Sequence, residues 1–151
     1  MRLVVQRVSS ASVHADGALI GTIARGAVVL VGVAEGDTSE IVDRMASKLI
    51  GLRYFEDPAG RTNLALAEVG GALLVVSQFT LLADVRHGRR PGFTDAAPPE
   101  WAEPLVDRFV ERLREGGADV VTGRFRAAMA VELVNDGPFT LVLDSERDLG
   151  A

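Results

Sequence analysis

"AVVLVGV", residues 27–33, is the stretch on which the fold depends. Its β-branched residues fall on both faces of an extended chain, a pattern typical of a strand that is buried on two sides. A second run of this kind, "ALLVVSQFTLL", spans residues 72–82. Between the two runs, Asp37 and Glu40 precede an apolar stripe at helical spacing, which predicts an N-cap with its reciprocal acid and a helix that ends at Gly51. We therefore expect two buried strands with a helix between them.

The segments on either side complete an α/β pattern. Asp16-Gly17 lies between two strand-like runs and predicts a β-hairpin. A second apolar stripe predicts a helix that ends at Gly116-Gly117. The other expected elements are strands at 2–13, 18–23, 52–56, 119–125, 129–135 and 139–143, with turns at 57–61 and 135–138. This order predicts a single domain, residues 1–151, in which two helices pack on one side of a mixed sheet that is barrel-like or forms two sheet layers.

The composition limits the classes of function. The chain has 151 residues, no cysteine, two histidines and a net charge of -5. Without cysteine there is neither a disulfide nor a thiolate metal site, and we expect no metal and no other cofactor. No apolar run reaches membrane-spanning length and the first residues do not resemble a signal peptide, so we expect no membrane partner and a cytoplasmic location. The negative net charge confines any contact with a polyanion to a local basic patch.

The common catalytic motifs are missing from the chain. It lacks G-x-S-x-G, H-E-x-x-H, the P-loop pattern and G-x-G-x-x-G. The two imidazoles, His14 and His87, fall in expected loops, where an exposed histidine without a catalytic role is the simpler interpretation. The chemistry must therefore be sought in other residues.

Two polar segments interrupt strands that are otherwise apolar. One is Ser77-Gln78-Phe79-Thr80, and the other is Asn135-Asp136-Gly137-Pro138. In the first, the hydroxyl groups either bond to neighbouring backbone while Gln78 points outward, or they bind a ligand. The second is either an ordinary turn or a functional loop, because each of its residues favours turns.

An arginine-rich segment lies between these two. "DVRHGRRPGF", residues 84–93, places Arg86, Arg89 and Arg90 around a glycine in an acidic protein. A solvated loop is the simpler interpretation, but clustered guanidinium groups also suit a phosphate clamp.

Several stretches along the chain are similar to the D-aminoacyl-tRNA deacylase family. They are "QRVSSASV" at 6–13, "GGALLVVSQFTLLAD" at 70–84, "GRRPGF" at 88–93, "DAAPPE" at 95–100, "TGRF" at 122–125 and "VNDGPFTLVLDS" at 134–145. The resemblance implies the fold of that family and a homodimer. It also implies hydrolysis of the ester that joins a D-amino acid, or glycine, to the 3'-terminal adenosine of tRNA.

The resemblance also implies roles for particular residues. Ser77, Gln78, Phe79 and Thr80 would form the catalytic segment, with Met129 lining the same pocket. Gly137-Pro138 would carry a cis peptide bond, enter the pocket of the partner subunit and reject L-amino acids. Arg86, Arg89 and Arg90 would contact tRNA.

The sequence departs from the family pattern at two places. Arg126 and Ala128 stand where the family usually has glycine or alanine and then aspartate, and Phe139 replaces a smaller valine. Both departures lie next to residues that the resemblance assigns to the pocket.

An aminoacyl ester is already activated, so a strong protein nucleophile is not obligatory. Backbone N–H groups around Phe79 and Thr80, and the Gln78 amide, are candidate donors to the developing oxyanion. Thr80 as a covalent nucleophile is the second hypothesis, since the sequence offers it no obvious activating base. A tRNA-binding module without catalysis and a dimeric scaffold remain as alternative functions.

Overall fold

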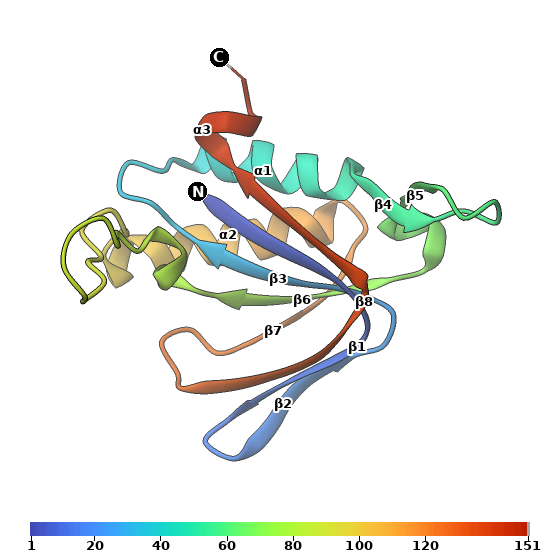
Figure 1. Cartoon of the computed structure of the whole chain (residues 1–151), viewed down its shortest axis with the longest axis horizontal. Helices are drawn as coiled ribbons and strands as arrows, with labels where there is room; N and C mark the ends of the chain where they lie inside the picture. Colours follow the sequence, from blue (N-terminus) through green and yellow to red (C-terminus); the bar gives the residue numbers. More distant parts are fainter. Residues whose placement is uncertain (151) are drawn as a thin grey trace.

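The computed structural model describes residues 1–150 and confirms the expected α/β class. Its main sheet has six strands in the order β2-β1-β3-β6-β7, with β8 paired to the other edge of β1. Figure 1 shows this sheet curled into a barrel-like shape, with the two long helices on one side. The strands are β1 Arg2–Ala15, β2 Ala18–Ile23, β3 Gly26–Gly32, β6 Ala72–Ser77, β7 Asp119–Thr122 and β8 Met129–Asp144.

The two apolar runs form the centre of the sheet, as predicted. β3 pairs antiparallel with β1 and parallel with β6. Val28 and Leu74 face an inner cluster within the curled sheet, whereas Val29 and Val75 face the helices. Both faces of these strands are therefore buried, which explains why their sequences show no alternation between apolar and polar residues.

The two long helices, α1 Ser39–Gly51 and α2 Pro99–Glu115, pack against each other and against the sheet. Asp43 on α1 joins them by accepting hydrogen bonds from Arg108 at 2.7 Å and Arg112 at 2.9 Å. These two guanidinium groups hold the pKa of the Asp43 carboxyl well below its ordinary value. None of the helices within residues 1–150 is long and apolar enough to cross a membrane.

The predicted N-cap of α1 was wrong by one residue. Thr38 caps the helix, and its side chain accepts a hydrogen bond from the Ile41 N–H. The Asp37 carboxylate is instead occupied by the ammonium group of Met1 at 2.6 Å and by the Ala34 N–H at 2.7 Å. A buried cation competes for the carboxylate more strongly than a helix N–H does, so Asp37 ties the start of the chain to the loop before α1.

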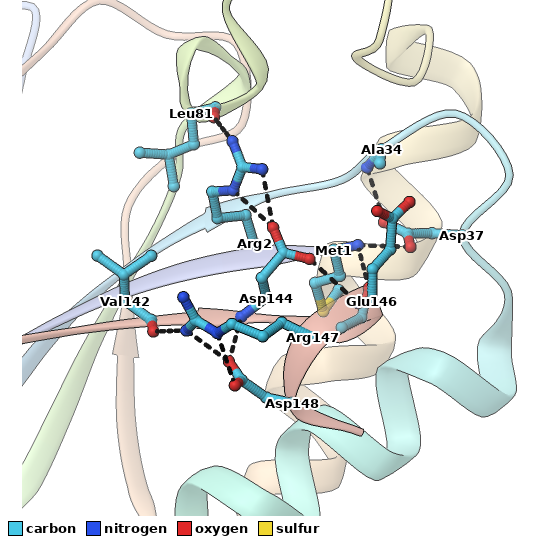
Figure 2. Close-up of polar contacts among 11 residues, drawn as sticks. Met1, Arg2, Ala34, Asp37, Leu81, Val142, Asp144, Glu146, Arg147 and Asp148 are labelled. Atoms are coloured by element: carbon cyan, nitrogen blue, oxygen red, sulfur yellow. Dashed lines mark hydrogen bonds and ion pairs between the residues drawn. The ribbon is translucent and has the colours of Figure 1, made fainter. Parts of the chain in front are cut away.

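Figure 2 shows a polar network around the start of β1 and the end of β8. The Arg2 guanidinium donates to Asp144 at 2.9 Å and to the Leu81 carbonyl at 2.8 Å. Through these bonds the start of β1 and the end of β8 hold the short 3-10 helix η2, Phe79–Leu82, in place. This helix directly follows β6 and contains part of the first polar segment.

The expected extent of several strands was also wrong, and the strand expected at 119–125 ends at Thr122. β6 ends at Ser77, and the chain then turns into η2, so the first polar segment lies at a strand end and not within a buried strand. Residues 129–144 form one strand, because β1 runs alongside both halves and offers each a pairing partner. The pairing register shifts between Gln6 and Val8, so residues 135–139 form a bulge in place of the predicted turn.

The turn at Asp16-Gly17 is confirmed, with positive φ of 51° and 75° at its two central residues. This is the conformation that an Asp-Gly hairpin turn requires. Four short elements complete the fold: β4 Arg53–Glu56, β5 Thr62–Ala65, η1 Leu66–Val69 and α3 Ser145–Asp148. β5, η1 and α3 were not expected from the sequence, since each spans only four residues.

Candidate active site

A cavity of about 640 Å³ opens where β3 and β6 end, beside the first turn of α2. Ser77, Gln78 and Phe79 form one part of its lining, and Met129 from the start of β8 lies in another. The structure thus brings together residues that are about 50 positions apart in the chain, and Thr80, which the resemblance placed with them, is not part of this lining. Phe93 also lines the cavity, and its ring meets the ring of Phe79 edge-on at 5.0 Å between centroids.

The polar segment is held in position by its own backbone. The Gln78 N–H donates to the Val31 carbonyl at 2.7 Å, which fixes the end of β6 against the end of β3. The Gln78 side-chain amide donates to the Thr80 hydroxyl oxygen at 2.5 Å. Thr80 therefore accepts a hydrogen bond, which links its hydroxyl group to Gln78 in the cavity lining.

Two backbone N–H groups at this position have no backbone partner. Phe79 and Thr80 form the first turn of η2, where N–H groups have no partner within the helix. Within residues 1–150 neither N–H donates to another backbone carbonyl, and both residues are exposed. Two adjacent N–H donors without a partner are a candidate site for stabilising a negatively charged oxygen.

Met129 is positioned by a tight turn at residues 123–128. Its sulfur accepts a hydrogen bond from the Arg124 N–H at 3.3 Å. A side chain at position 123 would bring its Cβ within 2.7 Å of the same sulfur, so Gly123 gives Met129 the space to lie against the turn. Phe125, from this turn, also lines the cavity.

The remaining wall of the cavity comes from a segment that the sequence did not single out as a site. Ala96 and Ala97 line the cavity just before α2. The Ala97 N–H donates to the Val33 carbonyl at 2.9 Å, and the Glu35 N–H donates to the Asp95 carbonyl at 2.9 Å. The only signal for this wall was the stretch "DAAPPE". Its small residues and prolines suit close packing against another loop.

The arginine-rich segment is a closed loop next to the cavity. Asp84 and Gly92 exchange two backbone hydrogen bonds of 2.8 Å at its base. Arg86 forms a bidentate ion pair with the Asp84 carboxylate, at 2.9 and 2.8 Å, which lowers the pKa of Asp84 to about 2. Arg89 and Arg90 are exposed, so this loop presents two guanidinium groups to solvent and uses the third within itself.

Gly137-Pro138 lies away from the cavity of its own chain. The peptide bond is cis, as expected, and both residues are exposed on β8. The Asn135 side-chain amide holds the bulge by donating to the Arg7 carbonyl at 2.8 Å and to the Phe139 carbonyl at 2.9 Å. Within a single chain, this loop and the Ser77–Thr80 segment do not share a cavity.

The chain is similar to known proteins over nearly its whole length. Residues 4–144 match the family model described as D-Tyr-tRNA(Tyr) deacylase. This chain belongs to that family. The D-aminoacyl-tRNA deacylase of Anaeromyxobacter dehalogenans is 60% identical over 147 residues, covering 97% of this chain and 99% of the relative. That of Symbiobacterium thermophilum is 57% identical and covers 97% of both chains.

A solved structure named c-Myc DNA Unwinding Element Binding Protein has the same fold. It superimposes with a TM-score of 0.90 and 39% identity, covering 95% of this chain and 98% of that chain. The similarity extends over nearly the whole length of both chains, so the two proteins share their overall fold.

Arg7 is a buried residue of this deacylase family member that the sequence reasoning missed. Its guanidinium donates to the Tyr54 carbonyl at 2.8 Å and to the Asp136 carbonyl at 3.0 Å, and it lies 4.5 Å from the ring centroid of Phe139. The sequence does contain a sign that Arg7 is buried. Side chains alternate between the two faces of a strand, and residue 7 therefore lies on the same buried face of β1 as Leu3. Arg7 therefore supports the Gly137-Pro138 bulge from inside.

The larger Phe139 side chain does not narrow the cavity of its own chain. Its ring stacks on Tyr54 with a centroid separation of 6.5 Å and covers the Arg7 guanidinium. Burial raises the pKa of the Tyr54 hydroxyl, which keeps this ring neutral within the packed group.

Within residues 1–150, no group of three or more histidine, aspartate or glutamate side chains is placed to hold a metal ion.

Proposed function

We propose that this chain hydrolyses the ester bond of D-aminoacyl-tRNA, and that of glycyl-tRNA, releasing the amino acid and tRNA. The observation that carries the proposal is the pair of N–H groups of Phe79 and Thr80 without a backbone partner, in a segment whose residues Ser77, Gln78 and Phe79 line the cavity. Membership of the deacylase family, and relatives more than half identical that are named D-aminoacyl-tRNA deacylases, support it.

The reaction uses placement and electrostatics. Water attacks the ester carbonyl carbon, and the carbonyl oxygen becomes an oxyanion that accepts hydrogen bonds from the Phe79 and Thr80 N–H groups. Removing one such donor from an enzyme typically costs about 10²- to 10³-fold in rate. The leaving group is the 3'-oxygen of the terminal ribose, and the neighbouring 2'-hydroxyl donates its proton to that oxygen while it takes up the proton that the attacking water releases.

Thr80 acts in this mechanism as a positioning residue. Its hydroxyl oxygen accepts a hydrogen bond from the Gln78 amide, which is not a base and cannot take the hydroxyl proton. A nucleophilic threonine requires an adjacent base. Gln78 and Thr80 instead hold η2 so that its first N–H groups point at the substrate.

Selection against L-amino acids requires a second copy of the chain. We infer a homodimer in which Gly137 and Pro138 of one subunit enter the cavity of the other, where a backbone carbonyl near the substrate α-carbon leaves space for hydrogen but not for a side chain. The exposure of both residues supports this arrangement. So does the exposed apolar surface along β8, since Val134 is 56% exposed and Val131, which lines the cavity, is also exposed.

The tRNA contacts come from the arginine loop. Arg89 and Arg90 are exposed beside the cavity and suit phosphate groups, while Arg86 stabilises the loop through Asp84. Aminoacylated tRNA is a cytoplasmic substrate in bacteria, so we place the protein in the cytoplasm. The protein needs no membrane partner for this reaction.

The decisive experiment compares D-tyrosyl-, L-tyrosyl- and glycyl-tRNA as substrates of the purified protein. Release of D-tyrosine and glycine, with L-tyrosyl-tRNA left intact, is the expected result. Binding of all three without release of any amino acid would instead identify a tRNA-binding module that retains the fold. Sedimentation of the same preparation tests the homodimer independently of the chemistry.

A further inference from the structure

The rim of the cavity carries one arginine that the mechanism above does not use. Arg126 lines the cavity between Phe125 and Ala127, and its side chain is exposed. It lies in the loop between β7 and β8, at the same end of the molecule as the arginine-rich loop (Figure 1). Phe93, which follows that loop, lines the same cavity. Arg126 is therefore the basic residue of the cavity lining itself, and the arginine-rich loop adjoins the cavity through Phe93.

The backbone at Arg126 is unfavourable for an arginine. The Ala127 N–H donates to the Arg124 carbonyl at 3.2 Å and closes a tight turn, in which Arg126 has a φ of 62°. Glycine adopts this left-handed conformation without steric cost. Within residues 1–150 the other non-glycine residue with positive φ is Asp16, and aspartate tolerates the conformation better than arginine does. An arginine kept in such a position indicates that its side chain has a use.

The Arg126 guanidinium is available to a ligand. Its neighbour Arg124 pairs with Asp16 at 3.5 Å, whereas Arg126 forms no ion pair within the part of the chain that the structure describes. A guanidinium group binds phosphate or carboxylate through parallel N–H donors. The ligand at this rim is therefore expected to be an anion.

The chemistry of the substrate identifies that anion, on the basis of the function proposed above. An aminoacyl ester has no free carboxylate, and its amino group is a cation that arginine repels. The negative charges of the substrate are its phosphates, and the one nearest to the ester is the 5'-phosphate of the terminal adenosine. We propose that Arg126 binds this phosphate at the rim and thereby sets how far the ester enters the cavity.

Two variants and two substrates test the proposal. Arg126→Gly removes the charge and suits the backbone, so it is expected to fold, while Arg126→Lys keeps the charge. D-tyrosyl-tRNA contains the phosphate, and D-tyrosyl-adenosine lacks it. With D-tyrosyl-tRNA, Arg126→Gly is expected to raise KM about tenfold, because one charge-assisted hydrogen bond is lost. The slope of log KM against log salt concentration should decrease by about 0.7 to 0.9, because one phosphate contact is lost.

Arg126→Lys should retain most of the affinity for D-tyrosyl-tRNA, and D-tyrosyl-adenosine should be cleaved equally by the parent and both variants. Arg61→Gln, an exposed arginine on the β4–β5 hairpin at the other end of the molecule, is the matched control and should behave as the parent (Figure 1). An equal loss on both substrates, or an unchanged salt dependence, would overturn the proposal. So would product inhibition by free D-tyrosine that disappears in Arg126→Gly, because the anion would then be the product carboxylate.

Binding of uncharged tRNA separates this proposal from the proposed function. If the parent protein cleaves neither substrate, the deacylase function fails, but the phosphate contact still predicts weaker and less salt-dependent tRNA binding by Arg126→Gly. Equal tRNA affinity in the parent, Arg126→Gly and Arg61→Gln would then refute the contact itself.

Discussion

Replacement of Arg7 by methionine should both destabilise the fold and weaken selection against L-amino acids. The guanidinium is buried, with 6% of its side chain exposed, and it donates to the Tyr54 and Asp136 carbonyls. A hydrogen bond to a charged group contributes about 1.5 to 3 kcal/mol to the free energy of unfolding. The substitution removes two such bonds, and the methionine side chain restores part of the packing, so we expect the free energy of unfolding to fall by about 3 to 5 kcal/mol. For a domain of this size that corresponds to a fall in Tm of roughly 6 to 20 °C.

Thermal unfolding followed by circular dichroism measures the first effect. Arg53→Met is the matched control, because Arg53 is exposed on β4 and surface substitutions usually change stability by no more than about 0.5 kcal/mol. The second effect follows from the bond between Arg7 and the Asp136 carbonyl, since residue 136 directly precedes Gly137-Pro138. Without it the bulge is less constrained, and L-tyrosyl-tRNA should be cleaved at a measurable rate.

The unfolding temperature and the cleavage of L-tyrosyl-tRNA test two separate parts of this prediction. An Arg7→Met protein that unfolds at the temperature of the Arg53→Met control would show that the buried hydrogen bonds contribute little. A destabilised protein that still rejects L-tyrosyl-tRNA as well as the parent would show that Arg7 supports the core but does not position the selecting loop. Assays at a temperature well below the lowered Tm keep the second comparison free of unfolding.

Four further predictions concern other parts of the molecule. Thr80→Ala should slow D-tyrosyl-tRNA hydrolysis but leave measurable turnover, and an acyl adduct on Thr80 found by mass spectrometry would contradict its positioning role. Changing Arg89 and Arg90 together to alanine should weaken binding of different tRNAs to a similar extent. It should also reduce the slope of log affinity against log salt concentration by about one to two units. An unchanged slope would show that the loop contacts solvent and not tRNA phosphates. Asp37→Asn should lower Tm, measured beside the Arg53→Met control, since removing a charge from a buried ion pair typically costs about 3 to 5 kcal/mol. Turnover should persist in a chelator, and full loss that zinc restores would contradict metal-free hydrolysis.

The centre of the fold was predictable because its signals are local. The apolar runs that become β3 and β6, and the Asp16-Gly17 turn, each carry their pattern within a few residues. The continuous β8 was not predictable in this way. Residues 135–138 have the composition of a turn, and only the presence of β1 along both halves of β8 makes the segment a bulge in one strand.

The resemblance correctly indicated the cis bond before Pro138. Ser77, Gln78, Phe79 and Met129, which it assigned to one pocket, line the same cavity, and their catalytic and binding roles stay predictions. The position of Arg7 relative to the bulge depends on the register between β1 and β8, which the sequence does not state. The pairing of Arg86 with Asp84 was equally hidden, since a loop of basic residues looks alike whether its charges are used internally or left to a ligand.

The end of β6 shows why the proposed donors are free of sheet pairing. The apolar residues Leu81 and Leu82 after the polar segment suggested a strand that continues, but the chain crosses over the end of β3 at Gly32. A Cβ there would lie 2.4 Å from the Leu82 side chain, 3.0 Å from the Leu81 Cβ and 3.2 Å from the Gln78 carbonyl oxygen, so glycine allows the chain to cross closely at this point. Because the chain turns here, the N–H groups of Phe79 and Thr80 are not paired within the sheet. Gly32 therefore favours the turn that leaves the proposed oxyanion donors without a backbone partner, although it is not itself part of the cavity lining.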